Sequence, residues 1–127
     1  MYSEGERLLL LQAMIVRRVP EKSRVESSLL MEALQADHEL VRQNTPHLYF
    51  NDWHTFVGME VDNCVEQELL DDGIRIVKGV RRGPAISSYT RTDLGNLFLK
   101  TLEPRLADAL EEMPMSDVGM LDFLGLL

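Results

Sequence analysis

Basic residues gather in two short stretches of an otherwise acidic chain. The formal net charge is −8, yet nine of the 13 Lys and Arg residues fall within residues 17–24 and 75–91. Lys and Arg side chains supply the phosphate contacts of nucleic-acid-binding proteins. No acid interrupts residues 75–91, so this stretch predicts a phosphate-binding patch made by Arg75, Lys78, Arg81, Arg82 and Arg91. The alternative is a solvated basic hairpin that discourages strand pairing at a sheet edge.

The stretch at residues 17–24 has four basic residues and one acid, Glu21. It offers a second candidate phosphate site. Arg17 and Arg18 also fall where the first predicted helix ends, and cations at that position stabilise the helix dipole. We favour this role at the end of the helix over a second phosphate site.

An acidic stretch lies directly before the basic one. Residues 52–72 hold seven Asp and Glu residues and no Lys or Arg. Acidic side chains repel phosphates, so this stretch is a poor reader of DNA. It is either a solvated face or a surface for a basic protein partner, with candidate contacts at Glu60, Asp62, Glu66 and Glu68.

The C-terminal residues 113–127 combine acids with a very apolar end. We expect them to form a tail beyond a domain at residues 1–112. A short acidic and apolar helix can bind in a partner's groove, and the candidate contacts are Phe123, Leu124 and Leu127. The alternative is that the tail packs on its own domain or on a second copy of the chain.

No catalytic or metal-binding pattern stands out. The three His residues lack a His-x-x-x-His spacing and there is no Cys-x-x-Cys pair, so neither a metal nor another cofactor is expected. The single Cys64 fits a reducing compartment and, like Trp53, falls on an apolar helix face as a core residue. The longest apolar run, residues 8–16, is too short to span a bilayer. We expect a cytoplasmic protein that is not an enzyme and has no membrane partner.

Three helices are expected before residue 73. Those at residues 4–19 and 24–43 each begin with the Ser-x-x-Glu spacing of a capping box. The first is apolar on most sides, which predicts burial between two layers or in a subunit interface. The third spans residues 52–72, and Gly73 is a suitable residue to end it.

A hairpin and a last helix follow. Residues 74–79 and 85–91 have the pattern of short strands, joined by a basic turn. A threonine at position 90 or 92 can cap the helix that begins at residue 93, and Pro104 should kink it or split it. The fold class is therefore mainly α with a small β-hairpin.

The stretch from residue 64 to residue 104 resembles winged helix-turn-helix regulators of the PadR and MarR kind. Their third helix commonly ends in Leu, one or more acids and a Gly before an apolar strand. A basic wing follows, then a strand ending in Tyr-x-Leu-Thr and a helix opening with x-x-Gly. Arg91 departs from this pattern, because an apolar residue is usual there. The matching residues, in order, are Leu70, Gly73, Ile74, Tyr89, Thr92 and Gly95.

This resemblance implies a winged helix with a C-terminal helical extension. In DNA-binding members of the fold the third helix enters the major groove and the wing reaches an adjacent groove or the backbone. The leading function is a small transcriptional regulator that binds double-stranded DNA mainly through its basic wing. The alternative is an adaptor, or a DNA-mimicking antagonist, that binds a basic protein partner through the acidic third helix and the C-terminal tail. A homodimer through the first and last helices is expected in either case.

Overall fold

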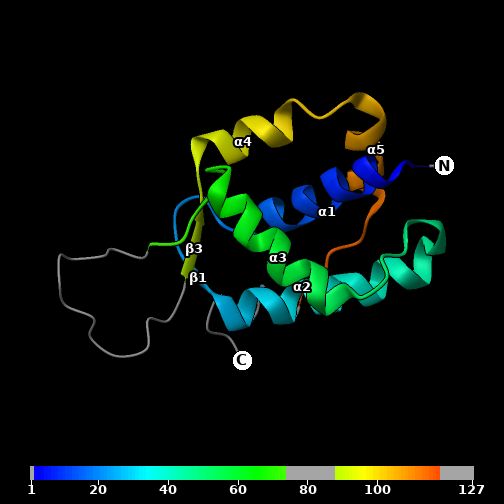
Figure 1. The fold of residues 1–127 in the computed structure, drawn as a ribbon, viewed down its shortest axis with the longest axis horizontal. Coiled ribbons are helices and arrows are strands. Elements are labelled where there is room, and N and C mark those ends of the chain that lie inside the picture. The colour runs from blue at the N-terminus through cyan, green and yellow to red at the C-terminus, as the bar shows by residue number, and fades with distance from the viewer. Residues whose placement is uncertain (1, 74–87, 118–127) are drawn as a thin grey trace.

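The computed structural model describes residues 2–73 and 88–117, which form five α-helices and a small antiparallel sheet (Figure 1). The helix α1 (Glu4–Arg18) lies in the middle of the molecule and contacts α2 and α3 on one side and α4 and α5 on the other. The sheet sits at one end of the helices. The expected mainly helical class with a small β element is therefore confirmed.

The first helix begins as its sequence predicts. The hydroxyl of Ser3 accepts a hydrogen bond from the backbone N–H of Glu6 at 3.1 Å, and the Glu6 carboxylate accepts one from the Ser3 N–H at 3.0 Å. This capping box satisfies two backbone donors that helix formation leaves unpaired. From Leu10 to Val16 every residue of α1 is buried. The apolar middle of the helix is therefore covered by other parts of the same chain.

The second predicted capping box is wrong. Val25 and Glu26 form strand β1 (Val25–Glu26), and α2 (Ser27–Asn44) starts after it with no side-chain cap at Glu26. Val25 pairs with Tyr89 of strand β3 (Ser88–Arg91), and both side chains are buried. Backbone pairing and apolar burial at this position outweigh the local preference of Ser23 for a helix start.

The third helix ends earlier than expected. After the 3-10 turn η1 (Pro46–Leu48), α3 (Trp53–Glu66) runs to Glu66, and Glu68 takes a left-handed conformation with φ of 63°. Strand β2 (Leu70–Asp71) follows, so Gly73, with φ of +65°, comes after a strand. The expected helix to residue 72 is wrong because Leu70 is buried and its backbone pairs with β3.

Strand β3 is the central strand of the sheet, whose order is β1-β3-β2. Leu70 pairs with Arg91 and Asp71 with Thr90, both antiparallel. Ser88–Arg91 confirms the second half of the strand expected at residues 85–91. The strand expected at 74–79 and the basic turn after it lie outside the described residues.

The two helices after the sheet begin where a cap and a proline predict. The hydroxyl of Thr92 accepts a hydrogen bond from the Gly95 N–H at 3.0 Å, and this cap starts α4 (Asp93–Lys100). Pro104 then separates α4 from α5 (Pro104–Glu112), as expected. Residues 113–117 continue onto α1 and α2, where Met113 and Ser116 are buried. None of the helices in residues 2–73 and 88–117 is long and apolar enough to cross a membrane.

One apolar core joins all five helices and the sheet. Trp53 is 6% exposed and Cys64 is fully buried, which confirms both as core residues. The ring of His38 stacks on Trp53 with the two ring centres 4.0 Å apart. Burial lowers the pKa of His38 and raises that of Cys64 to about 12, with the nearby Glu60 adding to the second effect.

Candidate interaction surface

Of the predicted nucleic-acid contacts, the structure describes one. Arg75, Lys78, Arg81 and Arg82 belong to residues 74–87, outside the described part of the chain. They occupy the connection between the paired strands β2 and β3.

Arg91 has a structural task at the end of α1. Its guanidinium donates hydrogen bonds to the carbonyls of Val16, Arg17 and Val19 at 2.8–3.0 Å, and only 15% of its side chain is exposed. It also reaches Glu21 at 3.3 Å. This corrects the expectation that Arg91 extends an exposed basic patch. Its donors satisfy carbonyls that the last turn of a helix leaves unpaired.

The basic stretch at residues 17–24 is also used within the chain. Arg17 donates to the carbonyls of Leu110 and Met113, at 2.6 and 3.1 Å. Arg24 donates to the hydroxyl and carbonyl of Ser88, both at 2.8 Å. These contacts join α1 and the chain after it to α5 and β3. They favour the structural interpretation of this stretch.

Glu60 does not belong to the exposed acidic surface. It is 7% exposed, and its carboxylate accepts hydrogen bonds from Gln12 at 2.9 Å and from Asn63 at 3.0 Å. This corrects the expectation that it contacts a partner. The sequence spacing could have indicated this burial, because Glu60 lies three residues after Val57 and four before Cys64, both on the buried face of α3.

The outer face of α3 combines acids with large apolar side chains. Asp62 and Glu66 are exposed there, as predicted, and Glu68 is exposed in the turn that follows. Phe56 and Met59 are 42% and 59% exposed, and residues three apart are neighbours on a helix. Neither residue was predicted from the sequence as a contact. Both fall outside the apolar positions of α3 that form the core, and this position could have indicated their exposure. We call Phe56, Met59, Asp62 and Glu66 the outer stripe of α3.

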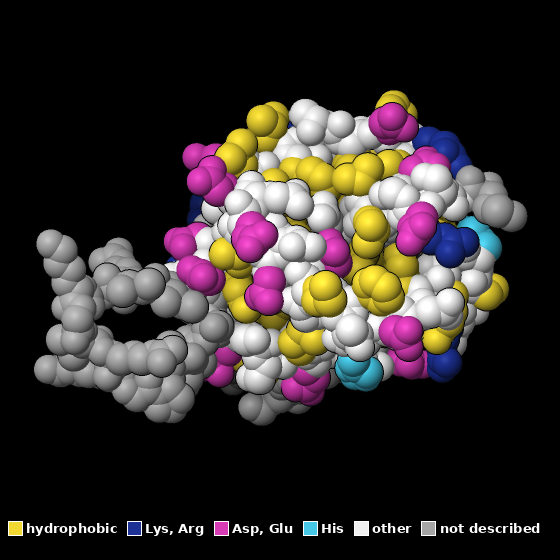
Figure 2. Space-filling model, viewed as in Figure 1, with side chains coloured by type: hydrophobic (Ala, Val, Ile, Leu, Met, Phe, Trp, Pro, Cys, Tyr) yellow, Lys and Arg dark blue, Asp and Glu magenta, His cyan; other side chains and the backbone are white. Residues whose placement is uncertain are grey.

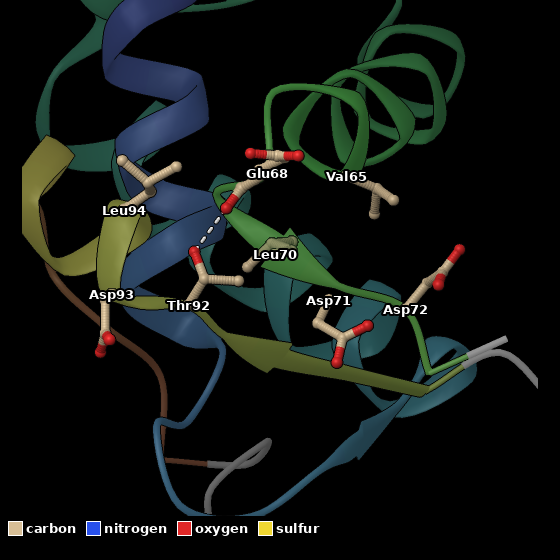
Figure 3. A pocket seen from close by; sticks show the side chains of 8 residues that line it. All are labelled: Val65, Glu68, Leu70, Asp71, Asp72, Thr92, Asp93 and Leu94. Atoms are coloured by element: carbon tan, nitrogen blue, oxygen red, sulfur yellow. Dashed lines mark hydrogen bonds between the residues drawn. The ribbon is translucent and has the colours of Figure 1, made fainter. Parts of the chain in front are cut away.

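A groove lies where the end of α3, strand β2 and the start of α4 meet, with a volume of about 550 Å³ (Figure 3). Leu70 lies between acidic side chains that spread around it, and the Thr92 hydroxyl donates to the Glu68 carbonyl at 2.5 Å. This bond holds the start of α4 against the end of α3. The lining residues are Val65, Glu68, Leu70, Asp71, Asp72, Thr92, Asp93 and Leu94.

Charge is unevenly spread over the face of the molecule drawn in Figure 2. Figure 2 shows acidic side chains crowded toward the sheet end of the molecule, with hydrophobic side chains between and beside them. The Lys and Arg side chains that stand out in this view lie mostly at the opposite end. An acidic surface with exposed apolar side chains suits a cationic, partly apolar partner.

Within residues 2–73 and 88–117, no three His, Cys, Asp or Glu side chains lie close enough to hold a metal ion. The contacts predicted in the tail, Phe123, Leu124 and Leu127, lie beyond residue 117 and outside the described part of the structure. Comparison of the chain with protein-family models, with curated proteins and with solved structures gave no significant match.

Proposed function

We propose that the chain is a winged helix. Its element order, α1–β1–α2–α3–β2–β3–α4, and its sheet order, β1-β3-β2, support this proposal. One residue of the resemblance pattern also has a fitting environment, since Gly95 lies against the carbonyl of Leu69, where a side chain has no room. Gly73 has the positive φ that favours glycine, but it follows strand β2 instead of ending α3.

We propose further that the protein binds a basic segment of another protein through the outer stripe of α3. The observation that carries this proposal is the exposure of Phe56 and Met59 beside Asp62 and Glu66 on one helix face. Exposed apolar residues grouped with charges are typical of interaction sites. The acids select a cationic partner, because matching charge steers association and disfavours wrong partners.

The same stripe argues against DNA reading by α3. Base and phosphate contacts favour Arg, Lys, Asn and Gln, but α3 has no Lys or Arg. Its exposed acids would face phosphates of the same sign.

A charge and polarity change on the stripe tests this proposal. The substitution Met59→Ser with Glu66→Lys should abolish capture of basic, partly apolar peptides from an array that varies both properties. The matched control, Met115→Ser with Glu111→Lys, makes the same two kinds of change at exposed positions in α5 and just after it. Capture that survives the stripe change, with circular dichroism showing an intact fold, would contradict the proposal.

A second candidate is a transcriptional regulator that binds DNA through residues 75–82. One observation favours it: Arg75, Lys78, Arg81 and Arg82 all fall in the connection between β2 and β3, the position of a wing. Arg81→Ala with Arg82→Ala should then weaken binding to random duplex DNA. Two lost phosphate contacts should make the negative slope of log K against log salt shallower by about 1.8.

The control for this test is Arg42→Ala with Lys100→Ala, which removes two exposed cations elsewhere. Absence of any DNA binding at low salt would remove this candidate, because electrostatic attraction is least screened there.

We propose a more limited form of the expected dimer. Most of α1 is buried within the chain, so a contact through the first and last helices would use Leu8 and Leu9 of α1 and Leu97 of α4. These side chains are 36%, 39% and 53% exposed. The mass of the protein in solution tests this directly, and Leu97→Ser should shift a dimer toward monomer.

A further inference from the structure

We propose that the groove between α3, β2 and α4 binds an Arg or Lys side chain of an amphipathic partner segment. The hydrocarbon stem of that side chain packs on the apolar floor, and its cationic head meets the carboxylates at the rim. This inference rests on the proposed protein-binding function and names a second contact site and the chemistry of the partner.

The floor of the groove suits a hydrocarbon stem. Leu70 is buried, Val65 is half-buried and Leu94 is 47% exposed although it lies in the first turn of α4. Long cationic side chains commonly lay their methylene groups along apolar surface while the charged head stays in water. An Arg or Lys stem would cover Leu94 in this way.

The rim supplies charge of the required sign. The carboxylates of Glu68 and Asp93 form no hydrogen bond or ion pair with any residue in 2–73 or 88–117. Asp71 is engaged differently, since it accepts a hydrogen bond from Gly73 at 3.0 Å and lies 3.9 Å from Arg24. Asp72, which also lines the groove, likewise has an interaction of its own. Glu68 and Asp93 are therefore the two carboxylates that a partner's cation would meet.

The carboxylates at the rim also indicate which kind of molecule the groove binds. Two copies of this chain packed groove against groove would bring like carboxylates together, which is unfavourable. A metal ion is not favoured either, because no three carboxylates or other ligands of the described chain converge closely enough. An extended organic cation fits separated carboxylates around an apolar floor.

The groove and the outer stripe lie within reach of one segment. Val65 comes six residues after Met59 on α3, a rise of about 9 Å along the helix axis. A partner helix covers that length in about six residues, so a single segment can place an apolar residue near Met59 and a basic one in the groove.

Methyl-labelled full-length protein and three defined peptides test this. Each peptide has about 14 residues, or four helical turns: one of Leu and Lys, one of Ser and Lys with equal charge, and one of Leu and Glu. The Leu/Lys peptide should shift the methyl resonances of Val65, Leu70 and Leu94 together with Met59. The other two peptides should shift none of them at the same concentration.

Charge removal at the rim gives the second readout. Glu68→Gln with Asp93→Asn should weaken Leu/Lys binding about fivefold, as expected when two partly exposed ion pairs are lost. The matched control, Asp108→Asn with Glu111→Gln, removes two exposed charges from α5 and should leave affinity nearly unchanged.

The outcomes separate this inference from the proposed function. Shifts confined to Met59 and its neighbours on α3 would overturn the groove site and leave the proposed function standing. No shift at any of these methyls would overturn both. If the Ser/Lys peptide binds as tightly as the Leu/Lys peptide, charge alone attracts the partner, and the proposed contact with the apolar floor is wrong. If the methyl resonances of the groove shift when the protein concentration is raised without peptide, the groove binds a second copy of this chain and the proposed partner is wrong.

Discussion

The guanidinium of Arg18 in α1 and the carboxylate of Asp37 in α2 form an ion pair, with Nη2 and Oδ1 2.8 Å apart, that is almost fully buried. Their side chains are 3% and 2% exposed. Ser116, in the chain after α5, joins the pair: its backbone N–H donates to Asp37 at 2.6 Å, and its hydroxyl oxygen lies 2.7 Å from Arg18. One buried network thus connects the end of α1, the middle of α2 and the C-terminal part of the described chain.

Asp37→Asn should destabilise the protein by about 3–5 kcal/mol, because it leaves the Arg18 charge buried without a counter-ion. Chemical denaturation measures this free energy of unfolding. Glu39→Gln, which breaks the exposed pair with Arg42, is the control and should cost less than about 1 kcal/mol. Similar losses in the two variants would contradict this cost of leaving Arg18 without a counter-ion. Replacing both Arg18 and Asp37 by Met and Leu should recover most of the loss.

Arg91→Ala should destabilise the protein by about 2–3 kcal/mol, because hydrogen bonds from a charged donor to the carbonyls at the end of α1 are lost. Arg91→Lys should not restore stability, since an ammonium group cannot reproduce the planar fork of a guanidinium. If the protein binds DNA, neither variant should change the salt slope of binding. A changed slope at unchanged stability would return Arg91 to the phosphate-contacting residues.

Two glycine-to-alanine changes should act in opposite directions. At Gly95 a Cβ atom would overlap the carbonyl oxygen of Leu69, so Gly95→Ala should cost about 1–3 kcal/mol. At Gly58, inside α3, nothing lies within 4 Å of the added atom, so Gly58→Ala should stabilise by about 0.5–1 kcal/mol. Thermal unfolding of both variants under one condition checks the pair. A loss of stability in Gly58→Ala would contradict the open space beside Gly58.

Stability should fall in alkaline solution through Cys64. Its pKa in the folded protein is about 12, raised from 9.0 by burial and by Glu60. The unfolded chain therefore loses the thiol proton above about pH 9 while the folded chain keeps it. The stabilising contribution is complete below pH 9 and is lost between pH 9 and 12. Denaturation of wild type and Cys64→Ala across this range should show a steeper decline for wild type. Parallel declines would argue against the raised pKa.

Local signals account for what the sequence predicted well about the fold. The cap at Ser3, the cap at Thr92 and the break at Pro104 all depend on residues within one helical turn. Strand β1 was missed because its partner lies far along the chain, at Ser88 and Tyr89. The end of α3 was placed late for the same reason, since pairing with β3 takes Leu70 out of the helix.

The candidate surface was less predictable than the fold. Asp62, Glu66 and Glu68 are exposed as expected, because charge alone favours that outcome. Glu60 and Arg91 form hydrogen bonds with polar groups of α1. These partners cannot be predicted from the sequence, because they depend on how the helices pack. The groove was invisible because Val65, Leu70 and Leu94 come from three elements that meet only in the folded chain.

The position of β3 in the sheet also sets an order of events during synthesis. Val25 of β1 has to wait for Tyr89, and at roughly 5–20 residues per second the ribosome needs about 3–13 s to deliver it. During that interval α2 and α3 are made, but β3, the strand with which β1 pairs, is not yet present. An unpaired strand edge invites pairing with other chains. The nascent chain is therefore most exposed to aggregation before β3 emerges, and protection by a chaperone would matter most in those seconds.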